Sequence, residues 1–162
     1  MYNVTIYTDG AASGNPGQGG YGAVLLCNGQ SKELSAGYVR TTNNRMELLA
    51  VIAALEALTQ ENCNVQLFTD SEYVVNAIEK GWLFQWERTA FKKKKNPDLW
   101  IRFLKVYRRQ KVKFNWVKGH SGNRYNERCD QLAVAASKQT NLLKDEGYIL
   151  SLETKGSDLF DE

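Results

Sequence analysis

The sequence has few of the residues that link a chain through disulfides or structural metals. Its three cysteines, Cys27, Cys63 and Cys129, are far apart and form no Cys-x-x-Cys pair. This pattern gives no indication of a zinc or redox site, so we expect buried, reduced thiols. Apolar runs are also short, because none approaches the roughly 20 residues that span a bilayer and no secretory hydrophobic region follows the polar start. We therefore expect a soluble, cytoplasmic protein.

The sequence contains no recognisable domain linker and no repeat of the solenoid kind. A chain of 162 residues that is 43% hydrophobic fits one compact domain. We place this domain in residues 1–148 and expect the acidic stretch at 149–162 to be a loosely ordered tail. We expect the protein to act as a monomer.

Acidic residues are scarce in one part of the chain. Of the 21 Lys and Arg, 12 lie between Arg88 and Lys118, where Asp98 is the only acid. Such a basic region is typical of proteins that contact nucleic acid phosphates, where binding releases counterions and weakens steeply with salt. The alternative is a solvated helix face, which the charge pattern alone does not exclude.

Five segments have the apolar pattern of strands: Tyr2–Thr8, Tyr21–Cys27, Ser31–Arg40, Val65–Thr69 and Lys111–Val117. Asn28-Gly29 joins the second and third segments and predicts a type I′ hairpin. Helices are predicted at about 45–59, 71–81, 96–108 and 126–137, whereas 82–95 fits no element clearly. Helical connections between strands imply parallel crossovers, so we expect an α/β fold with a mixed sheet flanked by helices.

Two aspartates follow strands that we expect to be parallel neighbours. Asp9 ends the first strand and Asp70 ends the fourth, and ligand sites of open α/β sheets lie beyond such carboxyl ends. Glu47, near the start of the first long helix, could point to the same edge. The alternatives are a capping box between Asn44 and Glu47, and turn or capping roles for the two aspartates.

Carboxylates gathered without Lys or Arg raise one another's pKa values unless a cation neutralises them. Hard oxygen ligands favour magnesium or manganese, and two such ions about 4 Å apart support in-line phosphoryl transfer. The acids therefore predict phosphodiester hydrolysis. His120 could carry protons at this site or be an ordinary exposed loop residue. Asp130 and Glu127 compete as a fourth carboxylate, and periodicity does not decide between them.

Six short motifs occur in order: Tyr7-Thr-Asp9-Gly10, Gly14-Asn-Pro-Gly17, Gly19-Gly-Tyr-Gly22, Thr42-Asn-Asn-Arg-Met-Glu47, Thr69-Asp70-Ser71 and Trp116-Val-Lys-Gly-His120. No single motif is diagnostic, but their order and spacing are specific. From about Tyr2 to Tyr148 the chain resembles bacterial type 1 ribonucleases H. The resemblance implies a ribonuclease H-like fold, with three antiparallel strands followed by two parallel ones. It also implies a metal-dependent endonuclease that hydrolyses the RNA strand of RNA/DNA hybrids and leaves 5′-phosphate and 3′-hydroxyl ends.

The resemblance further assigns the family's metal-binding acids to Asp9, Glu47, Asp70 and Asp130, the last through the motif Asn126-Glu-Arg-Cys-Asp130. In the implied two-ion scheme, Asp9 and Asp70 hold the ion that activates water. Asp9, Glu47 and Asp130 surround the ion near the leaving 3′ oxygen. His120 matches a histidine implicated in proton transfer or product release. The implied cofactor is Mg²⁺, with Mn²⁺ as a substitute and two ions bound together with substrate.

The resemblance implies three groups of substrate-binding residues and, in addition, one aromatic residue. One group lines the minor groove and senses RNA 2′ hydroxyls: Asn15, Asn43 and Asn44. Another forms a pocket for a DNA-strand phosphate: Arg40, Thr42 and Asn96. The third belongs to a basic protrusion that binds phosphates without reading bases: Lys92, Lys93, Lys94 and Lys95. Trp82 resembles an aromatic residue that packs against deoxyribose, so both strands would contribute to specificity.

Two alternative functions are distinguishable by substrate and turnover. A related nuclease of the same superfamily, such as an integrase or transposase, would act on DNA, and the asparagine group together with Trp82 argues against it. A catalytically silent hybrid-binding module would use the basic segment alone, and the four acids argue against it.

Glu72 departs from the glutamine of many relatives, and we assign it no role.

Overall fold

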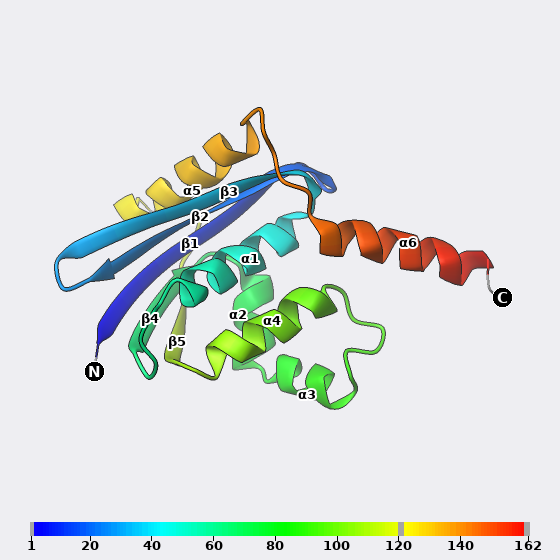
Figure 1. The fold of residues 1–162 in the computed structure, drawn as a ribbon. Helices are drawn as coiled ribbons and strands as arrows, with labels where there is room; N and C mark the ends of the chain where they lie inside the picture. Colours follow the sequence, from blue (N-terminus) through cyan, green and yellow to red (C-terminus); the bar gives the residue numbers. More distant parts are fainter. Residues whose placement is uncertain (1, 120–121, 161–162) are drawn as a thin grey trace.

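The computed structural model describes residues 2–119 and 122–160, and within this range five strands form one mixed sheet (Figure 1). The strands are β1 (Asn3–Gly14), β2 (Gly17–Cys27), β3 (Gln30–Thr41), β4 (Asn64–Thr69) and β5 (Lys111–Trp116). Their order is β3-β2-β1-β4-β5; β1, β2 and β3 are antiparallel, whereas β4 pairs in parallel with both β1 and β5. This topology confirms the predicted fold class.

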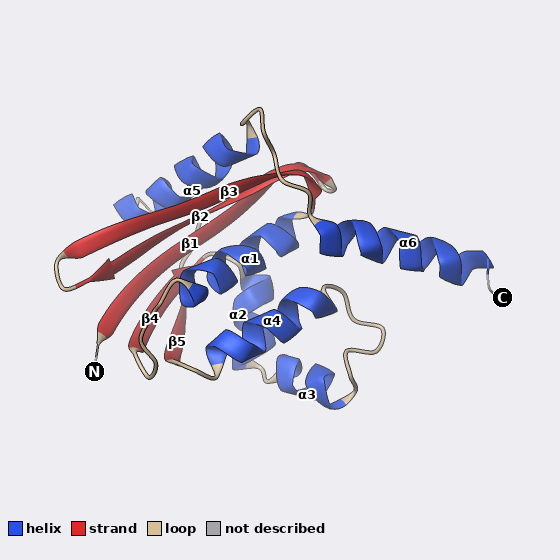
Figure 2. Cartoon of the chain, viewed as in Figure 1, coloured by secondary structure: helices blue, strands red, loops and turns tan. Residues whose placement is uncertain are grey.

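Helices cover both faces of the sheet. They are α1 (Asn43–Glu56), α2 (Glu72–Glu79), α3 (Trp82–Arg88), α4 (Pro97–Tyr107), α5 (Arg124–Ser137) and α6 (Glu146–Phe160). Helix α1 packs on one face, with α2, α3 and α4 on the same side, whereas α5 packs on the other face over β1, β2 and β3 (Figure 2). Within the described residues, no helix is long and apolar enough to cross a membrane.

Helix α1 contributes many residues to the core that packs against the sheet. Met46, Leu48 and Ile52 of α1 are fully buried, as is Ile6 of β1. Burying each such side chain contributes about 1.5 to 3 kcal/mol relative to exposure. Apolar packing therefore fixes where α1 starts relative to the strand ends, and this placement determines the geometry of the site described below.

The β2–β3 turn and the cysteines agree with the predictions made from the sequence. Asn28 and Gly29 have φ angles of 52° and 76°, the positive values that a type I′ turn requires. All three cysteines lie in the described part of the chain and are free thiols; Cys63 and Cys129 are buried, and Cys27 is half-buried.

Two boundaries near the predicted site differ from the sequence prediction. Strand β1 does not stop at Asp9 but continues to Gly14, because this glycine-rich stretch pairs with β2 although it lacks apolar alternation. Helix α1 is capped by Thr42, whose side chain accepts a hydrogen bond from the amide of Arg45 at 3.3 Å. The capping box between Asn44 and Glu47 is therefore wrong, and Glu47 is available for another role.

The C-terminal stretch contains a helix, and the expectation of a loosely ordered tail at 149–162 stays a prediction. Residues 146–160 form helix α6, which leads away from the body of the molecule (Figure 1). The side chain of Asp145 accepts a hydrogen bond from the amide of Tyr148 at 3.2 Å, and its carbonyl accepts one from Ile149 at 3.0 Å. Such bonds satisfy free amides at a helix start, so Asp145 initiates a helix that composition alone did not reveal. The domain boundary at 148 stays a prediction.

Candidate active site

The site begins at the carboxyl ends of two adjacent parallel strands. In the pairing of β1 with β4, Thr8 lies opposite Thr69, so Asp9 and Asp70 are the next residues along each strand. Asp9 is only 7% exposed, and Asp70 is half-buried. The two aspartates thus lie side by side, as the strand order predicted.

Glu47 reaches the same place because α1 crosses β1 very closely. A Cβ atom on Gly10 would lie 2.4 Å from the backbone nitrogen of Glu47, so only glycine permits this approach. The amide of Gly10 donates hydrogen bonds to Oε1 of Glu47 and, at 2.9 Å, to Oδ1 of Asp9. Gly10 therefore joins the two acids through one amide. The sequence analysis placed Gly10 in a motif without a role; its position directly after a strand-end aspartate was the available signal.

The acids form one cluster. Ligand oxygens of Asp9, Glu47 and Asp70 all lie within 4.8 Å of one another. Asp130, on α5, lines the same pocket without belonging to this tight group. The rest of the pocket is lined by polar, aromatic and glycine residues: Gly10, Asn43, Asn44, Ser71, Glu72 and Tyr73. Glu127 is exposed and is not among the lining residues, so geometry favours Asp130 as the fourth acid.

Electrostatics at the cluster favour a bound cation. Burial, followed by the charges of Asp70 and Asp130, raises the pKa of Asp9 to about 7, although a hydrogen bond to Glu47 partly opposes the shift. Burial and the neighbouring Asp9 raise the pKa of Glu47 well above its usual range. No Lys or Arg in the described part of the chain forms a salt bridge with these acids. A compact set of uncompensated carboxylate oxygens fits a divalent ion that prefers hard ligands.

Comparison with known proteins identifies the family. The RNase H family model matches residues 1–138. The chain belongs to the ribonuclease H family. A ribonuclease H from Desulforamulus reducens is 63% identical over 150 residues, which cover 90% of this chain and 94% of that protein. Membership makes this chain a metal-dependent endoribonuclease.

Solved structures of ribonucleases H share the fold. LC9-RNase H1, a type 1 RNase H with the type 2 active-site motif, superposes with a TM-score of 0.76 at 29% identity, covering 85% of this chain and 72% of that one. LC11-RNase H1, solved in complex with an RNA/DNA hybrid, has a TM-score of 0.59 at 30% identity, with coverage of 83% and 96%.

The asparagines predicted from the ribonuclease H resemblance gather at the edge of the acidic pocket. The side chain of Asn15 accepts a hydrogen bond from the amide of Asn43 at 3.1 Å, which ties the β1–β2 turn to the start of α1. Asn43 and Asn44 both line the pocket and are exposed. These polar groups are therefore accessible to a substrate that approaches the acids.

The other predicted substrate residues lie on neighbouring elements. Thr42 and Asn96 both contact Arg45, through bonds of 3.3 Å each, whereas Arg40 is exposed at the end of β3. Trp82 begins α3 and is 40% exposed, with the ammonium of Lys80 5.0 Å from its ring centroid. The structure thus connects Thr42 and Asn96 through Arg45, Thr42 to its backbone amide and Asn96 to its guanidinium.

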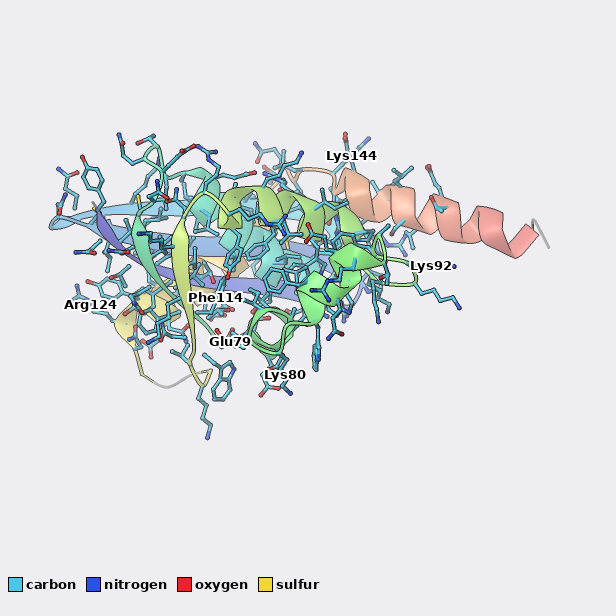
Figure 3. The ribbon with its side chains drawn as sticks, turned by 90° about the horizontal axis from the view of Figure 1, so that it is seen from below. Glu79, Lys80, Lys92, Phe114, Arg124 and Lys144 are labelled. Atoms are coloured by element: carbon cyan, nitrogen blue, oxygen red, sulfur yellow. The ribbon has the colours of Figure 1, made fainter. Side chains whose placement is uncertain are left out.

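The basic region divides into two parts. Three of its arginines form exposed ion pairs, Arg102 with Glu56, Arg108 with Glu87 and Arg109 with Glu61. For these residues the solvated-face alternative holds. Residues 92–95, by contrast, are exposed lysines between α3 and α4, and Figure 3 shows Lys92 reaching away from the body. The lysine segment is therefore the part suited to phosphate contact.

His120 lies outside the described residues. The preceding strand β5 ends at Trp116, whose indole donates a hydrogen bond to the carbonyl of Asp70 at 3.2 Å. The segment leading toward His120 thus starts beside the acidic cluster.

Proposed function

We propose that this chain hydrolyses the RNA strand of RNA/DNA hybrids with divalent metal ions held by Asp9, Glu47, Asp70 and Asp130. The observation that carries the proposal is the cluster of three carboxylates within 4.8 Å, open to a pocket that asparagines line. Mg²⁺ is the proposed ion, with Mn²⁺ as a substitute and two ions bound together with substrate. Divalent ions supply positive charge that stabilises the attacking and leaving oxygens of phosphodiester hydrolysis.

The residues of the chain have distinct tasks in this proposal. Asp9 and Glu47 are buried and fixed through the Gly10 amide, so they hold their oxygens in place without rearrangement on binding. Asp70 and Asp130 are more exposed and are proposed to hold the ions on the side from which the substrate phosphate approaches. His120 is proposed to carry a proton to or from the products, which bear a 5′-phosphate and a 3′-hydroxyl.

Selection of a hybrid requires contacts with both strands. Asn15, Asn43 and Asn44 are proposed to meet the minor groove, where the 2′ hydroxyl distinguishes RNA from DNA. The DNA strand is proposed to place a phosphate at Arg40, Thr42 and Asn96, and a deoxyribose against Trp82. The LC11-RNase H1 complex, which holds a hybrid on the same fold, supports this substrate class. A cytoplasmic location and action as a monomer belong to the same proposal.

A substrate panel tests the function. End-labelled RNA/DNA, RNA/RNA and DNA/DNA duplexes of one sequence are incubated with the protein and either Mg²⁺ or a chelator. Only the RNA strand of the hybrid should be cut, only with metal, and the products should carry 3′-hydroxyl ends. Cleavage of duplex DNA would favour the DNA-acting nuclease, and hybrid binding without cleavage would favour the silent module.

The lysine segment yields a separate prediction. Replacing Lys92, Lys93, Lys94 and Lys95 with alanine should weaken hybrid binding at low salt and lower the slope of log K against log salt by up to about 0.9 for each phosphate that these lysines neutralise. Binding is measured by fluorescence anisotropy across a salt series. A variant in which Lys32 and Lys111 are replaced with alanine serves as the control for general charge effects. Both lysines lie toward the end of the sheet opposite to Asp9 and Asp70. An equal change in slope for each lysine removed in the two variants would remove the segment from the binding surface.

A further inference from the structure

A buried arginine contacts two residues of the proposed phosphate pocket. Arg45, in the first turn of α1, is 2% exposed. Its guanidinium donates to Asp98 at 2.9 and 2.7 Å, to Asp145 at 2.8 and 2.9 Å, and to Oδ1 of Asn96 at 3.3 Å. Arginine has five side-chain N–H donors, and these five bonds account for all of them. Arg45 therefore has no donor left for a substrate phosphate and acts as a scaffold.

Two residues of the proposed phosphate pocket contact Arg45, one through its backbone and one through its guanidinium. The backbone amide of Arg45 donates to the side chain of Thr42, and its guanidinium donates to the side chain of Asn96. The amide nitrogen of Asn96 in turn donates to the hydroxyl of Tyr73 at 3.1 Å. The orientation of Asn96 thus depends on where the guanidinium of Arg45 is held, whereas Thr42 is fixed by the backbone at the start of α1.

The segment before α6 binds the guanidinium of Arg45 through Asp145. Leu143 forms backbone hydrogen bonds of 2.9 Å with Gly37 and Val39 of β3, which anchors the segment to the sheet. Asp145, 7% exposed, then accepts hydrogen bonds from Arg45 and, at 2.6 Å, from the hydroxyl of Thr41. One carboxylate thereby links the end of β3, the start of α1 and the start of α6.

Gly147 shows how tightly this segment covers the network. A Cβ atom at this position would lie 2.0 Å from Oδ2 of Asp98 and 2.7 Å from Nη2 of Arg45. Any larger residue would therefore push the Asp98 carboxylate away from the arginine. The segment from Leu143 to Gly147 closes the network rather than merely passing over it.

We propose that Asp145 is a positioning residue for the DNA strand: it fixes the guanidinium of Arg45, which in turn orients Asn96 toward a backbone phosphate. This inference rests on the proposed function and deepens it. Electrostatics alone predicts the opposite outcome, because removing the negative charge of Asp145 would make the region more attractive to phosphate. The sign of the change in affinity therefore separates positioning from bulk charge.

The test compares Asp145→Asn with Glu56→Gln, which breaks an exposed ion pair between α1 and α4. Steady-state kinetics on the hybrid should show KM raised about tenfold for Asp145→Asn, with kcat within about twofold of wild type. Glu56→Gln should match wild type in both. Circular dichroism at the assay temperature verifies that each variant is folded. Unchanged or lower KM for a folded Asp145→Asn overturns the proposal.

Further variants keep the test decisive. In a double-mutant cycle, Asp145→Asn should add little to the KM of Asn96→Ala, because both changes disable the same pocket. Full additivity would show that Asp145 does not act through Asn96. If Asp145→Asn does not fold, Gly147→Ala replaces it and should raise KM in the same way. Should wild type itself fail to cut the hybrid, the proposed function fails; if wild type cuts normally and KM does not rise, only the positioning role fails.

Discussion

Replacing Asp70 with asparagine is expected to lower kcat on the hybrid by about a thousandfold, or about 4 kcal/mol of transition-state stabilisation. The amide keeps the shape of the side chain but removes the charge that helps to hold the metal. Asp70 ends β4 and is half-buried, so the substitution should leave the fold intact. Single-turnover kinetics with saturating enzyme measures the effect on chemistry directly.

Binding should respond differently from turnover in that variant. Hybrid affinity of Asp70→Asn, measured by anisotropy, should remain within about threefold of wild type, because most affinity comes from phosphate contacts elsewhere. Glu61→Gln, a carboxylate-to-amide change at an exposed surface position, is the matched control and should retain full activity. Near-normal cleavage by Asp70→Asn would remove Asp70 from the metal site.

Metal-free protein is expected to lose stability as the pH rises from about 4 to about 7. Burial raises the pKa of Asp9 from 3.8 to about 7 and that of Glu47 well above its usual range, so the folded state binds more protons than the unfolded state in this window. The free energy of unfolding therefore falls with rising pH, by on the order of 4 kcal/mol for Asp9. Mg²⁺ at a hundredfold excess over Kd should then add about 2.7 kcal/mol above this window.

Urea unfolding with chelator across the pH series, repeated with Mg²⁺, measures both effects. Other groups also titrate, so the informative quantity is the difference between Asp70→Asn and wild type. The charge of Asp70 raises the pKa of both Asp9 and Glu47, and its removal should relieve the repulsion. The metal-free variant should therefore gain stability over wild type progressively as the pH rises. A difference that is constant with pH would contradict the electrostatic account of the cluster.

Sequence patterns identified the strand ends because strands carry a simple signal. Apolar alternation located the strand before Asp9 and a short apolar run located the strand before Asp70, and crossover rules made these strands parallel neighbours. Glu47 was harder, since its spacing from Asn44 equally suited a capping box. In the structure Thr42 is the N-cap of α1, which rules out the capping box. Glu47 reaches Asp9 because α1 lies very close to β1 at Gly10. Such a close approach is a tertiary property that a local pattern does not encode.

The ion pairs and the C-terminal helix were beyond local reasoning for a related reason. Asp145 is 100 residues from Arg45 in sequence, and nothing in the residues around it distinguishes it from other acids of the acidic tail. Likewise, only the folded chain shows which arginines of the basic region meet Glu56, Glu61 or Glu87. Both the role of Asp145 and the pairing of these arginines are determined by contacts between segments that are distant in the sequence.

The alignment of Thr8 with Thr69 makes the proposed metal site depend on correct pairing of β1 with β4. Sliding β4 by a single residue against β1 would displace Asp70 by about 3.3 Å and turn its side chain to the opposite face of the sheet. A misaligned chain would retain nearly the same content of strands and helices. Recovery of RNA cleavage during refolding should consequently report strand alignment, which far-ultraviolet spectra cannot distinguish.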